Sequence, residues 1–160
     1  MPVYQLGNEN DVFNAASVPD WANNSAVFGG NGDDTINTSD FRLGLTRNVF
    51  VDGGNGDDTI VLAAGDSVAF GGNGDDTLTS IGGLGNTLIG GNGDDTLVSI
   101  GGGSGMGPGN TLTGGLGNDT FIMVNDGNLV VTNDAGNDGV VSNGEALPHF
   151  AWSHPSRFVQ

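Results

Sequence analysis

Isolated apolar residues recur along the chain in short segments, each adjoining a glycine-rich stretch. One apolar column follows the glycines at Ile36, Ile60, Leu78, Leu97, Phe121 and Val140, and a second precedes them at Val27, Val51, Ala69, Leu88, Leu112 and Val131. The flanking positions are polar, β-branched or mixed, so each column predicts short β-strands with one inward-facing residue. Glycine at this density excludes a long helix.

A nine-residue motif repeats along the chain. Five copies align without gaps: GGNGDDTIN at 29–37, GGNGDDTIV at 53–61, GGNGDDTLT at 71–79, GGNGDDTLV at 90–98 and GGLGNDTFI at 114–122; a less regular copy, NDAGNDGVV, lies at 133–141. The first six positions are turn material, because glycine adopts positive φ without steric cost. Copies start 18 to 24 residues apart, which leaves room for two strands and two turns in each coil.

The repeat predicts an all-β fold, a parallel β-roll (β-solenoid) with two strands per coil of about 18 residues and about five to six coils. Stacked coils form two parallel sheets around a thin core, with one apolar residue per strand. We expect an N-terminal capping segment and first coil over 1–28, the roll over 29–141 and a C-terminal segment over 142–160. The final segment AWSHPSRFVQ begins like a streptavidin-binding affinity tag, so we assign it no function.

The charge of the chain is strongly one-sided. It has 19 Asp and Glu residues against three Arg and no Lys, and a net charge of −16. This charge argues against nucleic acids and anionic membrane surfaces as partners. No apolar run approaches the ~18 residues of a membrane span, the N-terminus lacks the pattern of a secretory signal peptide, and the absence of Cys excludes disulfides.

Stacking the coils places the sixth motif position in one column. This column contains Asp34, Asp58, Asp76, Asp95, Asp119 and Asp138, and the fifth position adds Asp33, Asp57, Asp75 and Asp94, then Asn118 and Asn137. Two bare charges a few ångströms apart repel by about 4 kcal/mol near a protein surface. Summed over the column, this repulsion rivals the ~5–15 kcal/mol stability of a typical domain. We therefore expect cations between the turns rather than a merely solvated acidic face.

The ligands available at these turns favour calcium. Carboxylates and carbonyls on a flexible backbone suit Ca²⁺, whereas Mg²⁺ demands stricter geometry and retains its waters. Zinc and copper lack their usual ligands, because there is no Cys and the two His residues, His149 and His154, lie outside the repeats.

The five regular copies resemble the RTX (repeats-in-toxin) family, whose signature is G-G-x-G-x-D-x-U-x, with U a large apolar residue. The resemblance covers residues 24–141 and implies a right-handed parallel β-roll with Ca²⁺ between successive turns on one edge. It implies carboxylate ligands at Asp34, Asp58, Asp76, Asp95 and Asp119, with Asp138 as a further one. It implies ligation by the turns at Gly29, Asn31, Gly53, Asn55, Gly71, Asn73, Gly90, Asn92, Gly114 and Leu116. Five regular motifs leave four gaps for ions, with room for a fifth beside Asp138.

The opposite edge of each coil carries only fragments of the motif, so we expect it to be mainly a loop edge. Insertions at 38–47 and 100–108 extend from it. The first contains Phe41 and Arg42 and is a candidate contact with a partner, although such insertions are more often merely tolerated.

No catalytic site is predicted, and the chain is expected not to be an enzyme. A phosphate-binding P-loop requires Lys, an EF-hand requires a closing Glu, and neither is present near the repeats. We expect a calcium-dependent structural, adhesive or surface-assembly module, secreted or at the cell surface of a bacterium; the resemblance implies type I export.

Two alternative functions remain open. The chain is the calcium-binding, stabilising module of a secreted protease, lipase or epimerase; or it binds ice through the threonines of the seventh position, at Thr35, Thr59, Thr77, Thr96 and Thr120. Self-association is a further option, through the open coil ends or through the outer sheet face that carries Phe28, Phe70 and Ile89, although that face is more simply explained as covered by the termini.

Overall fold

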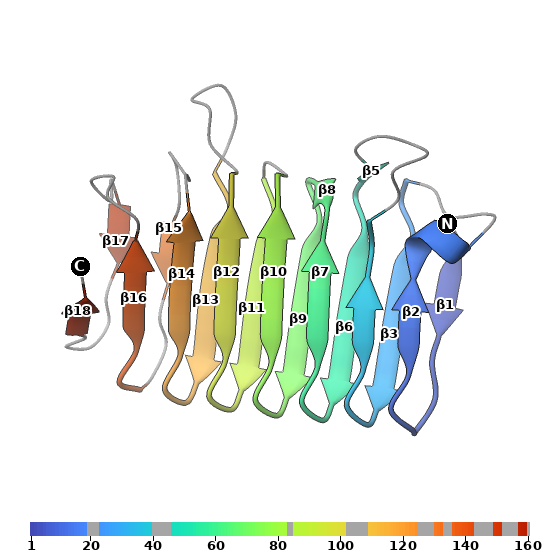
Figure 1. Ribbon diagram of the computed structural model, residues 1–160, viewed down its shortest axis with the longest axis horizontal. Coiled ribbons are helices and arrows are strands. Elements are labelled where there is room, and N and C mark those ends of the chain that lie inside the picture. The colour runs from blue at the N-terminus through green and yellow to red at the C-terminus, as the bar shows by residue number, and fades with distance from the viewer. Residues whose placement is uncertain are drawn as a thin grey trace.

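The computed structural model describes residues 1–18, 23–39, 46–82, 85–101, 109–124, 130–132, 136–142, 149–151 and 157–159. Its strands form two eight-stranded parallel sheets that face each other along the length of the molecule (Figure 1). A two-stranded pair, β5 (Thr46–Arg47) with β8 (Ala64–Gly65), and one 3-10 turn (Ala15–Ser17) complete the described elements. The predicted all-β parallel β-solenoid is confirmed.

Sheet 1 contains the strands that enter the glycine-rich turns. Its order is β1 (Val3–Gln5), β3 (Ala26–Asn31), β6 (Phe50–Asn55), β9 (Val68–Asn73), β11 (Thr87–Asn92), β13 (Thr111–Leu116), β15 (Val130–Thr132) and β17 (His149–Ala151).

Sheet 2 contains the strands that leave the same turns. Its order along the molecule is β2 (Val12–Asn14), β4 (Thr35–Asn37), β7 (Thr59–Leu62), β10 (Thr77–Ile81), β12 (Thr96–Ile100), β14 (Thr120–Val124), β16 (Gly139–Ser142) and β18 (Arg157–Val159). Sheet 2 rises at the front of Figure 1 and sheet 1 descends behind it as the chain advances from right to left, which is a right-handed coil.

The core has the two apolar rows that the sequence predicted. Ile36, Ile60, Leu78, Leu97, Phe121 and Val140 on sheet 2 are buried, as are Val27, Val51, Ala69, Leu88 and Leu112 on sheet 1. The side chain of Val131 lies outside the described set, although its backbone pairs with Leu112 in register.

Two further inward rows, which the sequence did not predict, make the core thicker than one residue per strand. The tenth position of each coil is also buried, at Thr38, Leu62, Ser80, Ser99 and Met123. Four residues before each motif lies another buried row, at Ser25, Val49, Ser67, Asn86 and Asn110. These rows line the side of the core away from the glycine turns, and most of their members are polar.

The sheets continue into both terminal regions. β1 and β2 belong to one coil, and its residues 6–14 align with the motif, so that Asp11 and Phe13 occupy the sixth and eighth positions and Phe13 is buried. The ring of Tyr4 packs on Phe13, with centroids 5.1 Å apart. At the other end β17 and β18 pair with β15 and β16. In the described part of the chain, no helix is long and apolar enough to cross a membrane.

Candidate metal centre

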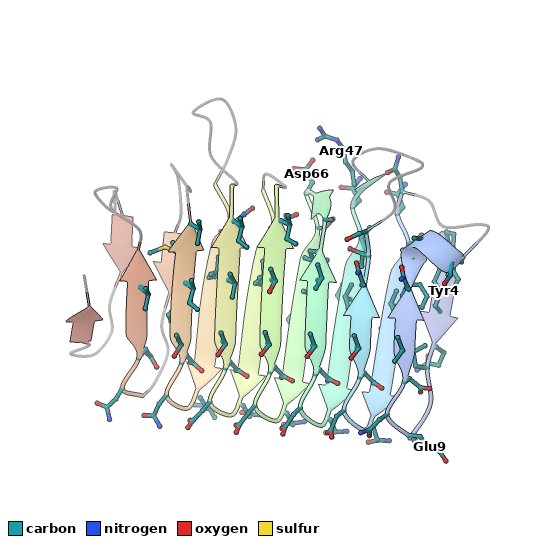
Figure 2. All side chains as sticks on the ribbon, viewed as in Figure 1. Tyr4, Glu9, Arg47 and Asp66 are labelled. Carbon is teal, nitrogen blue, oxygen red and sulfur yellow. The ribbon has the colours of Figure 1, made fainter. Side chains whose placement is uncertain are left out.

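The five glycine-led turns and the turn that carries Asp138 line up along one edge of the roll, which we call the acid edge. It is the lower edge in Figure 2, where Glu9 marks its N-terminal end. The sixth-position carboxylates point into the molecule, and Asp34, Asp58, Asp76, Asp95, Asp119 and Asp138 are each only 1–2% exposed. The sequence predicted the column but not its burial. A buried carboxylate is costly unless it is paired.

One oxygen of each carboxylate takes part in a continuous hydrogen-bonded ladder. The backbone N–H of Asp58 donates to Oδ1 of Asp76 at 2.7 Å, and that of Asp76 donates to Oδ1 of Asp95 at 2.9 Å. The same bond joins the remaining coils, from Asp11 to Asp34, Asp34 to Asp58, Asp95 to Asp119 and Asp119 to Asp138, at 2.7–2.9 Å. The backbone N–H of each coil therefore fixes the sixth-position carboxylate of the following coil.

The second carboxylate oxygen has no such partner. Oδ2 is buried without a hydrogen bond from the described residues at Asp34, Asp58, Asp76, Asp95 and Asp138. Buried polar atoms in native proteins are almost always satisfied, so a recurring exception indicates a missing ligand or ion.

The first glycine of each motif makes room for that oxygen. A Cβ added to Gly71 would collide with Oδ2 of Asp76 and would lie 2.7 Å from the carbonyl oxygen of Gly90 in the next coil. Glycine at this position thus lets a carboxylate oxygen and a main-chain carbonyl of the following coil approach the same small volume. The same arrangement recurs at Gly29, Gly53 and Gly90.

Burial raises the pKa of these carboxyls. The pKa of Asp76 rises to about 7 and those of Asp58 and Asp95 rise to about 6, chiefly because burial disfavours the charged form and secondarily because neighbouring acids repel it. Burial also raises the pKa of Asp34 and of Asp138. Donation from the backbone N–H groups opposes the effect without cancelling it.

The donors at this edge fit a calcium ion better than a transition metal. Within the described residues, no three Asp, Glu, His or Cys side chains converge on one point. Any ion between two coils must therefore complete its shell with main-chain carbonyls, which is typical of Ca²⁺ sites on open turns. The buried, unsatisfied Oδ2 atoms and the neighbouring glycine carbonyls supply such oxygen ligands.

The third-position residues lie on the outside of the same turns. Their main-chain oxygens at Asn55, Asn73, Asn92 and Leu116 accept from the fourth-position N–H of the preceding coil at 2.8–2.9 Å. The asparagine side chains at this position form an exposed hydrogen-bonded row from Asn8 through Asn31, Asn55 and Asn73 to Asn92. These residues therefore brace successive turns, and their carbonyls retain a second lone pair for an ion.

The fifth-position acids form a separate, exposed ladder with the opposite direction. Oδ1 of Asp57 accepts from the N–H of Asp75 at 2.8 Å, and Oδ1 of Asp75 accepts from the N–H of Asp94 at 2.8 Å. Because these side chains reach water, they carry charge at little cost.

Sequence reasoning missed a further hydrogen-bonded ladder, which lies on the opposite edge of the roll; we call this edge the amide edge. The N–H of Ser67 donates to Oδ1 of Asn86 at 3.0 Å, and the N–H of Asn86 donates to Oδ1 of Asn110 at 2.9 Å. The amide groups of these two asparagines donate in turn to Oγ of Ser80 and Ser99, each at 2.9 Å. The Gly-Asn fragments at 85–86 and 109–110 were the available signal. The insertion residues Phe41 and Arg42 lie outside the described residues.

Comparison with known proteins gives one family. The family model of the RTX calcium-binding nonapeptide repeat matches in four copies, at residues 23–41, 44–80, 81–99 and 108–122, which together cover more than half of the chain. No curated protein matches the chain. No solved structure matches it either. With its glycine-led turns and stacked aspartates, the chain belongs to the family of RTX calcium-binding nonapeptide repeats.

Proposed function

We propose that this chain is a non-catalytic module that folds when Ca²⁺ binds along the acid edge. The observation that carries the proposal is the row of buried Oδ2 atoms without hydrogen-bond partners. Without a cation, folding must bury these carboxylates either charged and unsatisfied or protonated. With calcium, the same burial becomes favourable, and binding free energy becomes folding free energy.

The proposed ions lie between successive coils. The carboxylates of Asp34, Asp58, Asp76, Asp95 and Asp119 are the proposed acidic ligands, and carbonyls of the glycine-led turns complete each shell. Five regular turns leave four gaps, and the turn at Asp138 adds a fifth. Support comes from the hydrogen-bond ladder, which holds Oδ1 of each acid and leaves Oδ2 for the ion.

The proposed setting is outside the cell or at the surface of a bacterium. Extracellular calcium-binding modules work at ion concentrations of about 0.1–1 mM, so a weak-affinity roll stays open in the cytosol and closes after export. Export in the unfolded state by a type I route is consistent with this logic. The proposed role is structural or adhesive, within a surface assembly.

Circular dichroism during a calcium titration tests the switch. We expect a disordered spectrum in chelator, a cooperative gain of β structure with Ca²⁺ and a much smaller response to Mg²⁺, because Mg²⁺ retains its waters. Light scattering on the same samples reports compaction and mass. A full β spectrum in chelator, unchanged by calcium, would refute the proposal.

Assembly through the open end of the roll is a second proposal. β1 and β2 are the terminal strands of their sheets, and Val3 and Val12 are 57% and 80% exposed there. Terminal strands present unpaired backbone groups that another chain can pair with. We expect the calcium-loaded mass to rise with protein concentration, and a Val3→Lys/Val12→Lys variant to remain monomeric. A monomeric parent at all concentrations would contradict this.

Ice binding remains a weaker candidate. Thr35, Thr59, Thr77, Thr96 and Thr120 stand in register on sheet 2 and point outward. The adjacent ninth-position row mixes Asn37 with Val61, Thr79, Val98 and Ile122, which makes a less uniform face. Thermal hysteresis in the presence of calcium tests it, and no measurable hysteresis removes it.

A further inference from the structure

The outward face of sheet 1 carries one acid within a row of aromatic rings. Asp52 lies in register between Phe28 on β3 and Phe70 on β9. Phe50 stands two residues earlier on the same face of β6, so aromatic side chains lie on three sides of Asp52. All four side chains are half-buried.

The three rings form a continuous group. The ring of Phe50 lies 5.6 Å from that of Phe28 and 5.6 Å from that of Phe70, centroid to centroid, and both pairs are tilted by 46°. Tilted rings at this separation attract each other and hold their positions. They therefore present a preformed apolar and π-rich surface beside the carboxylate, with little side-chain entropy left to lose on binding.

Asp52 has no cation of its own in the described part of the chain. It makes no hydrogen bond or ion pair with the described residues, and the described guanidinium of Arg47 is already bonded to Asp66 at 2.7 Å on the opposite edge of the roll (Figure 2). An apolar residue at this position would be cheaper for folding alone.

We propose that Phe28, Phe50, Phe70 and Asp52 form a binding site for an arginine side chain of a partner polypeptide. The carboxylate accepts a two-pronged hydrogen bond from the guanidinium, and the ring faces attract its positive charge.

The chemistry of the site selects among cations. A quaternary ammonium group has no N–H to donate to Asp52, and an open sheet face does not enclose it. A lysine ammonium donates hydrogen bonds, but it is compact and strongly hydrated, so it loses more hydration free energy than a guanidinium when it leaves water. A guanidinium is planar, weakly hydrated and able to stack on a ring while bonding a carboxylate. The chain also remains acidic after its net charge of −16 is partly offset by bound Ca²⁺, and this charge attracts a basic segment.

Nuclear magnetic resonance tests the site on the full, calcium-saturated chain in about 0.15 M salt, where long-range charge effects are screened beyond ~8 Å. The probe is N-acetyl-arginine amide, compared with N-acetyl-lysine amide and tetramethylammonium. We expect arginine to shift the amide signals of residues 28, 50–52 and 70 with the lowest Kd of the three probes.

Variants assign the effect to the site. Asp52→Asn is expected to weaken arginine binding about 5-fold and Phe50→Leu about 2- to 3-fold, the range of exposed ion pairs and cation–π contacts. Asp66→Asn is the matched control, because it removes an acid from the opposite edge, and it should leave Kd unchanged. Circular dichroism with calcium verifies that each variant is folded.

Three outcomes would overturn the proposal. One is an unchanged Kd in Asp52→Asn, and another is a set of shifted signals elsewhere on the protein. The third is a folded Asp52→Asn variant that dimerises while the parent shows no response to arginine, because Asp52 would then act only to keep aromatic faces of two molecules apart.

Discussion

The two edges of the roll are built on the same type of hydrogen bond but differ in the chemistry of the side chains that accept it. On both edges an inward-pointing side chain accepts a hydrogen bond from the backbone N–H of the preceding coil. On the acid edge the acceptor is an Asp oxygen, as in the 2.7 Å bond from Asp58 to Asp76. On the amide edge it is an Asn or Ser oxygen, as in the 2.9 Å bond from Asn86 to Asn110.

The difference lies in the second polar atom of each side chain. The amide nitrogens of Asn86 and Asn110 find serine hydroxyls inside the roll. Oδ2 of Asp58 and of Asp76 find no such partner among the described residues. The amide edge is therefore complete by itself, whereas the acid edge is complete only with a proton or a cation. The calcium dependence that we propose thus comes from one edge, while the other edge supplies the uncharged half of the coil.

Converting the acid edge into a second amide edge should have the largest effect. In an Asp58→Asn/Asp76→Asn/Asp95→Asn variant, Oδ1 still accepts the N–H of the preceding coil, and three of the six buried carboxylates lose their charge. We expect this variant to form β structure in chelator and to lose most of its stabilisation by calcium. That stabilisation is about 2.7 kcal/mol per ion when the free calcium concentration is a hundred times Kd. Denaturant unfolding with and without calcium measures both.

The exposed fifth-position acids provide the matched control. Asp57→Asn/Asp75→Asn/Asp94→Asn makes the same change in net charge outside the core. It should retain the calcium response. An equal loss of response in both triple variants would mean that net charge, not the buried oxygen, controls folding.

Acid should partly replace calcium at the acid edge. The folded-state pKa values of about 6, 7 and 6 for Asp58, Asp76 and Asp95 exceed the ordinary value of 3.8. A raised carboxyl pKa favours the folded state below the unfolded pKa, and this contribution is lost as pH rises through the folded pKa. In chelator, stability should therefore be greatest near pH 4 and fall by several kcal/mol up to pH 7, at about 1.4 kcal/mol per pKa unit.

Denaturant unfolding across this pH range provides the measurement. With saturating calcium the sign should reverse, because the ion needs ionised ligands. High salt at pH 7 is the control for general charge repulsion, which it screens. If salt alone restores folding in chelator as fully as acid does, protonation of the buried row is not the cause.

Filling the space above a first-position glycine should expel the carboxylate. A Cβ at Gly71 meets Oδ2 of Asp76 and the main-chain oxygen of Gly90, and the carboxylate of Asp76 is held in the ladder by the N–H of Asp58. We expect Gly71→Ala to lower the free energy of unfolding by about 4 kcal/mol in calcium, at the upper end for single substitutions. Gly82→Ala is the comparison, since nothing lies within 4 Å of its added Cβ and only its φ of 67° opposes alanine. That change should cost about 1–2 kcal/mol, and similar losses at both positions would contradict the steric account.

Placing a charge on the amide edge should destabilise it in a way that calcium does not repair. Asn110→Asp leaves the bond from Asn86, loses the donor to Ser99 and Ser80, and buries a charge on the edge opposite the stacked aspartates. We expect a loss of about 2–3 kcal/mol with or without calcium. The exposed Asn73→Asp is the control and should cost less than about 1 kcal/mol. Rescue of Asn110→Asp by calcium would show that the two edges are chemically equivalent.

The smallest effect is expected outside both ladders. Arg47 and Asp66 form an ion pair at 2.7 Å, with side chains 62% and 46% exposed. Exposed pairs contribute about 0–1 kcal/mol, so a double-mutant cycle of Arg47→Ala and Asp66→Ala should give a coupling within that range and little change in calcium response. A coupling above about 2 kcal/mol would contradict the description of this pair as an ordinary exposed ion pair.

Sequence reasoning recovered the elements that repeat in phase. The apolar eighth position, the apolar position before each motif and the column of sixth-position aspartates are all visible in a gapless alignment of five copies, and the strands lie where these columns place them. The irregular ends were harder, because the coil at 6–14 keeps Gly7, Asn8 and Asp11 but not the leading glycine pair. The assignment of the individual metal ligands, and the division at residues 28 and 141, remain predictions.

By itself, the sequence determined the repeat, the two-stranded coil and the column of acids, because a stacked fold turns each repeated position into a straight row. Only the tertiary structure decided which way those acids point and what meets them. The burial of Oδ2, the serine partners of Asn86 and Asn110, and the rings around Asp52 depend on contacts between residues 6 to 30 positions apart. The spacing of the motifs places these residues in common rows, but which side chains become buried, how the rings tilt and which atoms bond are decided only when the coils stack.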